Sequence, residues 1–323
     1  MFAVYAAEPN PRDPLAALRV GKRPDPEVPA GFVPVTIRAA SLNMHDLWTL
    51  RGVGIQPEQF PMILGCDGAG LLLDGSEVVL YPVVTSSGWA GDETLDPRRT
   101  LLTEKLQGTF ADTVVVPERN VAPKPTSLTF LEAACMGTAW LTAYRMLFVK
   151  SGLRPGQTML VQGASGGVST ALVQLGQAAG MRVWVTGRTE QKRHLAQELG
   201  AHRTFETGAR LPERVDAVFD TVGKATWPHS MKCLKPGGII VCSGATSGDP
   251  DRAELQRLFF LQLRVVGSTM GTRDELDDLL SFLDVTGVRP QIGTTLPMTD
   301  AERGFQAMLD GNTAGKIVFT RSS

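Results

Sequence analysis

The sequence predicts a two-domain α/β protein in which a doubly wound parallel sheet is joined to a β-rich domain. Apolar strands alternate with helical patterns from residue 158 to about residue 285, which is typical of a parallel sheet with helices on both faces. A glycine-rich turn joins the first of these strands to its helix. The first ~120 residues instead contain short apolar runs separated by turn residues, a pattern that favours β structure.

The composition is that of a folded protein and excludes several classes of function. The 323 residues are 43% hydrophobic and 20% charged, so the chain can form a sizeable core without disulfides or metal ions. Because the formal net charge is only -1, no large basic field is available to bind a nucleic acid or an anionic membrane surface. The first residues lack a signal-peptide pattern, and the four cysteines lie far apart. We therefore expect a cytoplasmic protein with reduced cysteines and no membrane or nucleic-acid partner.

The β-rich domain is predicted to combine both ends of the chain. Its apolar runs in the first part of the sequence include FVPVTIRAA, EVVLYPVV and TVVVP. Beyond Arg289-Pro290, the sequence again predicts short strands, with an amphipathic helix over residues 301–309 before the final strand GKIVFT. This pattern resembles that of the first part of the chain. We therefore assign residues 1–124 and 290–323 to the β-rich domain and residues 125–289 to the α/β domain.

The α/β domain is expected to begin with a helix. Thr129 and Glu132 have the spacing of a capping box, and an apolar run that continues to Leu147 follows them. After this run come helices over residues 168–180 and 191–199 and the strands TMLVQ, RVWVT, VDAVFD, GGIIVC and LRVVGS. Strands separated by helices in this way build a parallel sheet.

The segment MLVQGASGGVS has the order strand, glycine-rich turn and helix that a dinucleotide-binding unit requires. Glycine lets the backbone approach a pyrophosphate closely, and the helix N-terminus offers amide donors and a positive dipole end. The turn departs from the strict G-x-G-x-x-G pattern at its first and last glycines, and a purely structural turn is the alternative. We expect a dinucleotide to contact Ser165, Gly166, Gly167 and Val168.

The end of the second strand favours NADP(H) over NAD(H). An NAD enzyme usually carries an acidic residue there, which binds the ribose 2′-hydroxyl. This strand ends instead at Gly187 and Arg188, and a guanidinium can pair with a 2′-phosphate. Lys192 adds a second positive charge on the same helical face. Glu190 argues for NAD(H), and both cations could instead be solvated surface residues.

Four motifs, in this order, resemble the medium-chain dehydrogenase/reductase superfamily. They are AASLNMHDLWTLRG, FPMILGCDGAG, the QGASGGVS turn and the terminal GNTAGKIVFT. The resemblance covers essentially the whole chain and implies a Rossmann dinucleotide-binding domain plus a GroES-like catalytic domain. Zinc-dependent relatives hold their catalytic metal at positions that align with Asn43, Cys66 and Thr138, of which only the cysteine is a usual zinc ligand. Residues 86–108 align with the cysteine-bearing lobe of those relatives and contain no cysteine.

The unsuitable catalytic metal positions and the cysteine-free lobe both resemble the zinc-free quinone-reductase branch of the superfamily, whose members use NADPH. Where no metal polarises a carbonyl, an acceptor that is already electron-poor needs less activation for hydride transfer. We expect hydride transfer from NADPH to a quinone or another α,β-unsaturated carbonyl. LRVVGSTMG resembles the edge strand through which relatives pair into dimers, so the resemblance implies a homodimer, with a tetramer as the alternative. The alternatives are a reductase for an enoyl thioester or enone of secondary metabolism, an NADPH-binding redox sensor with little turnover, and a zinc alcohol dehydrogenase.

The resemblance also implies the residues of the site. Asn43 is expected beside the nicotinamide and the substrate as the catalytic residue, with a turn-capping role as the alternative. Trp48 is expected to line the same pocket or to be a core residue, and Asp46 is expected to be structural. His45 could deliver a proton. The other expected cofactor contacts are Thr138, Thr142, Ser243, Gly244, Ala245, Asn312 and Lys316. For the two threonines, core packing is the alternative.

Overall fold

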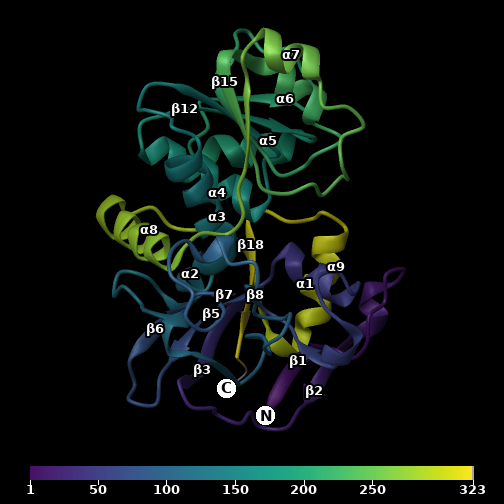
Figure 1. The fold of residues 1–323 in the computed structure, drawn as a ribbon, viewed down its shortest axis with the longest axis vertical. Helices are drawn as coiled ribbons and strands as arrows, with labels where there is room; N and C mark the ends of the chain where they lie inside the picture. The colour runs from purple at the N-terminus through teal and green to yellow at the C-terminus, as the bar shows by residue number, and fades with distance from the viewer. Residues whose placement is uncertain (322–323) are drawn as a thin grey trace. The chain divides into compact units, whose positions relative to one another are not determined.

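The computed structural model describes residues 1–321, which fold into two compact units. The first unit contains Met1–Ala139 and the segment that begins at Met270, and the second unit contains Trp140–Thr269. In Figure 1 the yellow C-terminal strand lies within the unit that the purple and blue N-terminal part of the chain builds. The first unit therefore combines both ends of the chain.

Hydrogen bonds within the first unit explain why its boundaries differ from 124/125 and 289/290, the positions taken from the sequence. The hydroxyl of Tyr81 donates to the carbonyl oxygen of Gly271 at 2.8 Å. The guanidinium of Arg289 donates to the carbonyl oxygen of Ser127 at 3.2 Å. These bonds attach the residues near both predicted boundaries to the first unit.

The second unit is a six-stranded parallel sheet with flanking helices. The strand order is β13-β12-β11-β14-β15-β16, and every neighbouring pair is parallel. This is the Rossmann arrangement, so the predicted fold class is confirmed. The strands are β11 (Thr158–Gln162), β12 (Arg182–Gly187), β13 (Arg203–Glu206), β14 (Val215–Asp220), β15 (Leu234–Cys242) and β16 (Arg264–Gly267). The helices are α3 (Leu141–Tyr144), α4 (Gly167–Ala178), α5 (Glu190–Glu198), α6 (Trp227–Cys233) and α7 (Leu255–Phe260).

Helices cover both faces of this sheet because successive strand residues point to opposite sides. Leu160 of β11 and Trp184 of β12 form a buried cluster with Met231 of α6. Met159, the neighbour of Leu160 in β11, faces the other side of the sheet. There, a Cβ added to Gly176 of α4 would lie 2.6 Å from the Met159 sulfur. The central strands β11, β12 and β14 are therefore buried on both faces, and their apolar runs are nearly continuous.

The first unit is built around a seven-stranded sheet. The order along it is β10-β6-β5-β3-β18-β17, and β9 also pairs with β3. Smaller sheets have the orders β2-β1-β4 and β7-β8. The strands are β1 (Phe2–Ala6), β2 (Leu18–Lys22), β3 (Phe32–Ser41), β4 (Met62–Ile63), β5 (Asp67–Leu71), β6 (Glu77–Leu80), β7 (Val83–Val84), β8 (Thr100–Leu101), β9 (Thr113–Pro117), β10 (Val121–Pro123), β17 (Ile292–Pro297) and β18 (Lys316–Thr320). The helices are α1 (Met44–Leu50), α2 (Phe130–Ala133), α8 (Arg273–Thr286) and α9 (Ala301–Leu309).

Aromatic side chains from distant parts of the chain meet in the core of the first unit. Phe110 packs edge-on against Phe319 of β18, with ring centroids 5.0 Å apart and planes at 89°. Phe305 of α9 lies 6.3 Å from Phe110, centroid to centroid. Burying each ring contributes about 1.5–3 kcal/mol relative to an exposed ring. This packing holds β18 in the sheet and so fixes the position of Lys316, its first residue.

Local signals in the sequence predict some elements well and miss others. Thr129 and Glu132 form the expected capping box: each side chain accepts the backbone N–H of the other residue, at 3.3 and 2.8 Å. Past α2, the helical path contains π-type turns at Met136–Trp140 and Arg145–Lys150. Strand β13 is not predicted, because its sequence RTFE is polar and only half-buried. None of the described helices is long and apolar enough to cross a membrane.

Close contact between β3 and β5 makes one glycine indispensable. A Cβ added to Gly70 would lie 2.1 Å from the carbonyl oxygen of Thr36, which is backbone and cannot rotate away. We expect Gly70→Ala to lower the free energy of unfolding by about 1–3 kcal/mol. The control is Gly21→Ala on β2, where no atom lies within 4 Å, and we expect a change within about 0.5 kcal/mol. Chemical denaturation of both variants measures the difference, and equal stabilities would contradict the predicted clash.

Candidate functional site

The first unit contains a buried polar cluster made by the side chains of Ser41, Asn43, Asp67 and Lys316, with an ion pair at its centre. Lys316 is only 3% exposed and Asp67 is fully buried, and their charged atoms lie 3.4 Å apart. The Lys316 ammonium also donates to the carbonyl oxygen of Leu42 at 3.0 Å and to Asn43 Oδ1 at 2.6 Å. The sequence assigned Lys316 to cofactor phosphates, which stays a prediction. The described structure places its ammonium inside this cluster.

Asn43 shares the same cluster from the N-terminus of α1. Its Nδ2 donates to Asp67 Oδ2 at 2.8 Å and to the carbonyl oxygen of Ser41 at 3.2 Å, while its Oδ1 accepts from Lys316. Asn43 is the N-cap residue of α1, where it belongs to a capping box with Asp46, and it is 6% exposed. Every polar atom of the amide therefore has a partner within the first unit.

Asp46 anchors the start of α1. Its two carboxylate oxygens accept the backbone N–H groups of Asn43 at 2.9 Å and Gly65 at 2.8 Å. Burial raises the pKa of Asp46 to about 7, and the two accepted hydrogen bonds oppose that rise. Because both oxygens are occupied by backbone donors, the geometry supports the structural role expected from the sequence.

His45 and Glu104 form a second polar pair beside the cluster. His45 Nε2 is buried, has no hydrogen-bond partner among the described residues, and lies 3.8 Å from Glu104 Oε1. The other oxygen of Glu104 accepts from the hydroxyl of Thr100 and the backbone N–H of Leu101. Burial lowers the pKa of His45, and the negative charges of Glu104 and Asp67 oppose that decrease. Sequence reasoning singled out His45 but not Glu104, since the two are far apart in the chain.

The residues at the aligned metal positions do not fit a catalytic zinc ion. The Cys66 thiol donates to the carbonyl oxygen of Leu102 at 3.2 Å. Burial raises the pKa of this thiol well above its usual value, and the nearby charge of Asp46 adds to the rise, whereas zinc binds a thiolate. The amide of Asn43 is bound to an ammonium instead. Thr138 Oγ1 is buried without a hydrogen-bond partner among residues 1–321, and a hydroxyl is not a usual zinc ligand.

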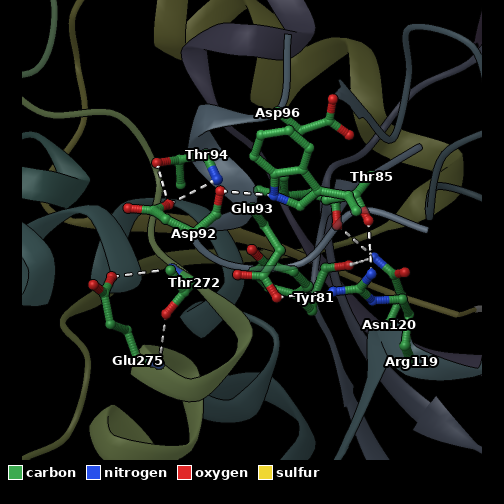
Figure 2. A network of polar contacts seen from close by, with 12 residues as sticks. Tyr81, Thr85, Asp92, Glu93, Thr94, Asp96, Arg119, Asn120, Thr272 and Glu275 are labelled. Carbon is green, nitrogen blue, oxygen red and sulfur yellow. Dashed lines mark hydrogen bonds and ion pairs between the residues drawn. The ribbon is translucent and has the colours of Figure 1, made fainter. Parts of the chain in front are cut away.

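Polar side chains organise the lobe over residues 86–108 (Figure 2). Asp96 accepts the backbone N–H and the hydroxyl of Ser86 at 2.6 and 2.8 Å, and Asp92 accepts the hydroxyl of Thr94 at 2.6 Å. Arg119 joins the lobe to the sheet through Glu93, at 2.9 Å. Across the described chain, no three His, Cys, Asp or Glu side chains are grouped so that they could hold a metal ion. Hydrogen bonds and an ion pair therefore connect the lobe internally and to Arg119.

In the second unit, the glycine-rich turn leads from β11 into the N-terminus of α4. Gly163 has a φ of +91°, a conformation that favours glycine. Gly166 occupies the N-cap position with φ -74° and ψ 158°, and no side chain in the described structure caps the helix. The first amide groups of this twelve-residue helix are therefore available to an anion. Ser165, Gly167 and Val168 belong to the same turn and first helical turn.

The end of β12 provides positive charge beside this turn. A Cβ added to Gly187 would lie 2.9 Å from Cγ of Arg193 and 3.0 Å from Cβ of Ala164, so the position has no room for a side chain. Arg188, the next residue, is exposed. Burial lowers the pKa of Lys192, and the nearby positive charge of Arg188 adds to that decrease. An anion between them would relieve this repulsion.

The other predicted site residues divide between the two units. In the second unit, Ser243, Gly244 and Ala245 follow β15, and the backbone N–H of Ser243 donates to the carbonyl oxygen of Asp220 at 3.1 Å. Thr142 is buried on α3. The first unit contains a partly buried Trp48 on α1 and an exposed Asn312 in the turn before β18. Among the predicted residues of the first unit, the structure therefore joins Asn43 to Lys316 and leaves Asn312 outside the buried cluster.

Comparisons with known proteins match both units. The family model described as an alcohol dehydrogenase GroES-like domain matches residues 29–126, and that described as a zinc-binding dehydrogenase matches residues 167–284. The acryloyl-coenzyme A reductase of Metallosphaera sedula is 28% identical over 318 residues, covering 92% of this chain and 94% of that protein. The quinone oxidoreductase of Pseudomonas aeruginosa is 28% identical over 306 residues, covering 88% and 90%. A crystal structure described as an NAD-dependent alcohol dehydrogenase has a TM-score of 0.92 and 32% identity, covering 100% of both chains.

Removing one partner of the buried ion pair should be costly. Lys316→Met leaves the Asp67 carboxylate buried without its ammonium, and we expect the free energy of unfolding to fall by about 3–5 kcal/mol. In the matched control Lys235→Met, the ion pair with Asp216 has a lysine side chain that is 42% exposed, and we expect a loss below about 1 kcal/mol. The double substitution Asp67→Asn with Lys316→Met should recover part of the loss. Denaturant titrations of the wild type and the three variants measure these costs, and a cost for Lys316→Met no larger than the control would contradict the role of the pair.

Proposed function

The chain belongs to the medium-chain dehydrogenase/reductase superfamily of oxidoreductases, and we propose that it uses NADPH to reduce a quinone or another α,β-unsaturated carbonyl without zinc. The observation that carries this proposal is the Lys316 ammonium on Asn43 Oδ1. This ammonium binds the amide oxygen of Asn43, the residue that aligns with a metal-binding position of zinc-dependent relatives. Together with the protonated thiol of Cys66, it leaves no suitable donor set for zinc at the aligned positions.

The proposed NADPH site follows the glycine-rich turn and the end of β12. The uncapped N-terminus of α4 offers amide donors to a pyrophosphate. Arg188 and Lys192 offer positive charge to a 2′-phosphate. When bound, NADPH supplies the hydride. NADH is the competing cofactor, because Glu190 begins α5 and a similar crystal structure is described as NAD-dependent.

The acceptor class is proposed from the absence of a suitable zinc donor set. A simple ketone needs a Lewis acid or strong donors on its oxygen, whereas a quinone or enone delocalises the incoming negative charge. Asn43 remains the proposed catalytic residue, and since both amide protons are donated to Asp67 and Ser41, we propose that it shapes the acceptor site by contact. Similar proteins include an acryloyl-coenzyme A reductase and a quinone oxidoreductase, so an enoyl thioester is the alternative acceptor.

A panel of acceptors tests this function. NADPH oxidation is followed with a small quinone, an enone, an enoyl thioester and a saturated ketone as the negative control. We expect turnover with at least one electron-poor acceptor and none with the ketone. Binding of NADPH without turnover on any acceptor would favour a redox sensor, and turnover confined to the ketone would contradict the proposed acceptor class.

The two cations near the end of β12 should set the cofactor preference. We expect Arg188→Ala to raise the KM for NADPH about 10- to 100-fold, since it removes a charge-assisted bond to phosphate, and to leave the KM for NADH nearly unchanged. The matched control is Arg182→Ala at the start of the same strand, where the guanidinium pairs with Glu213 at 3.2 Å. Steady-state kinetics with both cofactors measure the effect. An equal loss for NADPH and NADH would argue against 2′-phosphate recognition.

We also propose a homodimer and a cytoplasmic location. Strand β16 ends the order of the six-stranded sheet, and Val265 on it is 45% exposed. On α7, Phe259 and Phe260 are 69% and 79% exposed, which is unusual for large apolar side chains. Light scattering should give about twice the chain mass of 34.7 kDa. Val265→Lys should shift this mass toward a monomer, because a charge on an edge strand opposes pairing. A monomeric wild-type protein would contradict the homodimer.

A further inference from the structure

A buried chain of polar side chains crosses the carboxyl ends of three neighbouring strands in the second unit. Thr186 lies near the end of β12, Gln162 ends β11 and Asp220 ends β14. Helix α6 adds Ser230 and the partly exposed His229. Apart from His229, these residues are at most 1% exposed. Ligands of such sheets bind at this edge, and the glycine-rich turn begins directly after Gln162.

The carboxylate of Asp220 fixes the direction of the hydrogen bonds. It accepts the backbone N–H groups of Val222 and Gly223 at 2.8 and 3.1 Å, and it accepts the hydroxyl of Ser230 at 2.7 Å. Since Ser230 gives its one proton to Asp220, its oxygen is free only to accept. Gln162 therefore turns its amide nitrogen toward Ser230 and donates to that oxygen at 3.0 Å.

With this orientation, Gln162 links the glycine-rich turn to α6. Its Oε1 accepts from the hydroxyl of Thr186 at 2.6 Å, and Thr186 Oγ1 accepts from the backbone N–H of Gly163 at 3.4 Å. Gly163 is the first residue of the turn. The second amide proton of Gln162 points at His229 Nδ1, 3.0 Å away. Hydrogen bonds thereby connect the first residue of the turn, through Thr186 and Gln162, to His229.

His229 fits this network only as a neutral imidazole with its proton on Nε2. Nδ1 accepts from Gln162, whereas Nε2 donates to the carbonyl oxygen of Ala209 at 2.8 Å. The sulfur of Cys233 lies 3.3 Å from Nε2. Burial raises the pKa of that thiol to about 11, so it provides no negative charge to an imidazolium. Asp220, the carboxylate of the network, is separated from His229 by Ser230.

We infer that Gln162 and His229 are positioning residues for the dinucleotide-binding turn, and that proton uptake by His229 weakens dinucleotide binding. The inference rests on the proposed function, because it requires a dinucleotide at this turn. A proton on Nδ1 would face the amide nitrogen of Gln162, so two donors would oppose each other. Rotating the amide would repair that contact but set its oxygen against Ser230, whose proton is held by Asp220. Either arrangement leaves a buried polar group without a partner as long as the turn keeps the position that binds the dinucleotide. Binding would therefore oppose proton uptake by His229, and we expect the protonated form to bind about tenfold more weakly.

Titrations with NADP⁺ test this inference. The dissociation constant is measured from about pH 8 to about pH 5.5, the range in which histidines take up a proton. The key variant is His229→Asn, whose Oδ1 can still accept from Gln162 but cannot be protonated. We expect it to bind like the wild type at the upper pH and to lose about tenfold less affinity at the lower pH. The 2′-phosphate of NADP⁺ and other groups of the protein also titrate in this range, and His229→Asn shows the pH dependence that remains without His229.

Two further variants complete the experiment. His229→Leu offers no acceptor to Gln162 and should bind NADP⁺ about tenfold more weakly at every pH. His194→Asn alters a histidine on α5 whose side chain is 69% exposed, and it should keep the wild-type pH dependence. If His229→Leu does not fold, His229→Asn still carries the test. Wild-type pH dependence in His229→Asn would overturn this inference alone. A wild-type protein that fails to bind NADP⁺ near pH 8 would overturn the proposed function and the inference together.

Discussion

The ion pair between Lys316 and Asp67 is the contact on which the site in the first unit depends. Two buried charges are costly to remove from water unless each is well paired. Here Asp67 Oδ2 also accepts from Ser41 and Asn43, and the ammonium also donates to Leu42 and Asn43. The pair joins β18 at the C-terminus to β5 and to the start of α1. The cluster therefore forms only when both ends of the chain have come together.

This cluster gives a physical reason for the proposed chemistry. A lysine ammonium is a fixed cation that does not exchange or open a coordination site, so it cannot polarise a carbonyl as a Lewis acid does. The Asn43 amide, which this ammonium binds, therefore makes its hydrogen bonds within the protein. Under the proposed function, an acceptor bound beside Asn43 would have to be able to accept negative charge without a metal. Quinones, enones and enoyl thioesters share that property, and this is why they are grouped in the proposal.

The sequence predicted what local patterns encode and missed what depends on distant contacts. The alternation of strands and helices predicts the parallel sheet, and the fold class is confirmed. Motifs located Asn43, but they could not show that Lys316, 273 residues away, would donate to its side chain. The pairing of His45 with Glu104 and that of Gln162 with His229 also join residues far apart in sequence. Whether Asn312 and Lys316 also reach cofactor phosphates stays a prediction.

The most direct measurement is the rate of NADPH oxidation with an accepted quinone or enone after exhaustive dialysis against a strong chelator. A metal-free mechanism predicts the same rate before and after dialysis, and no increase when zinc is added back. Loss of activity on dialysis, with recovery on adding zinc, would contradict it and would mean that Cys66 and its neighbours rearrange to hold the metal.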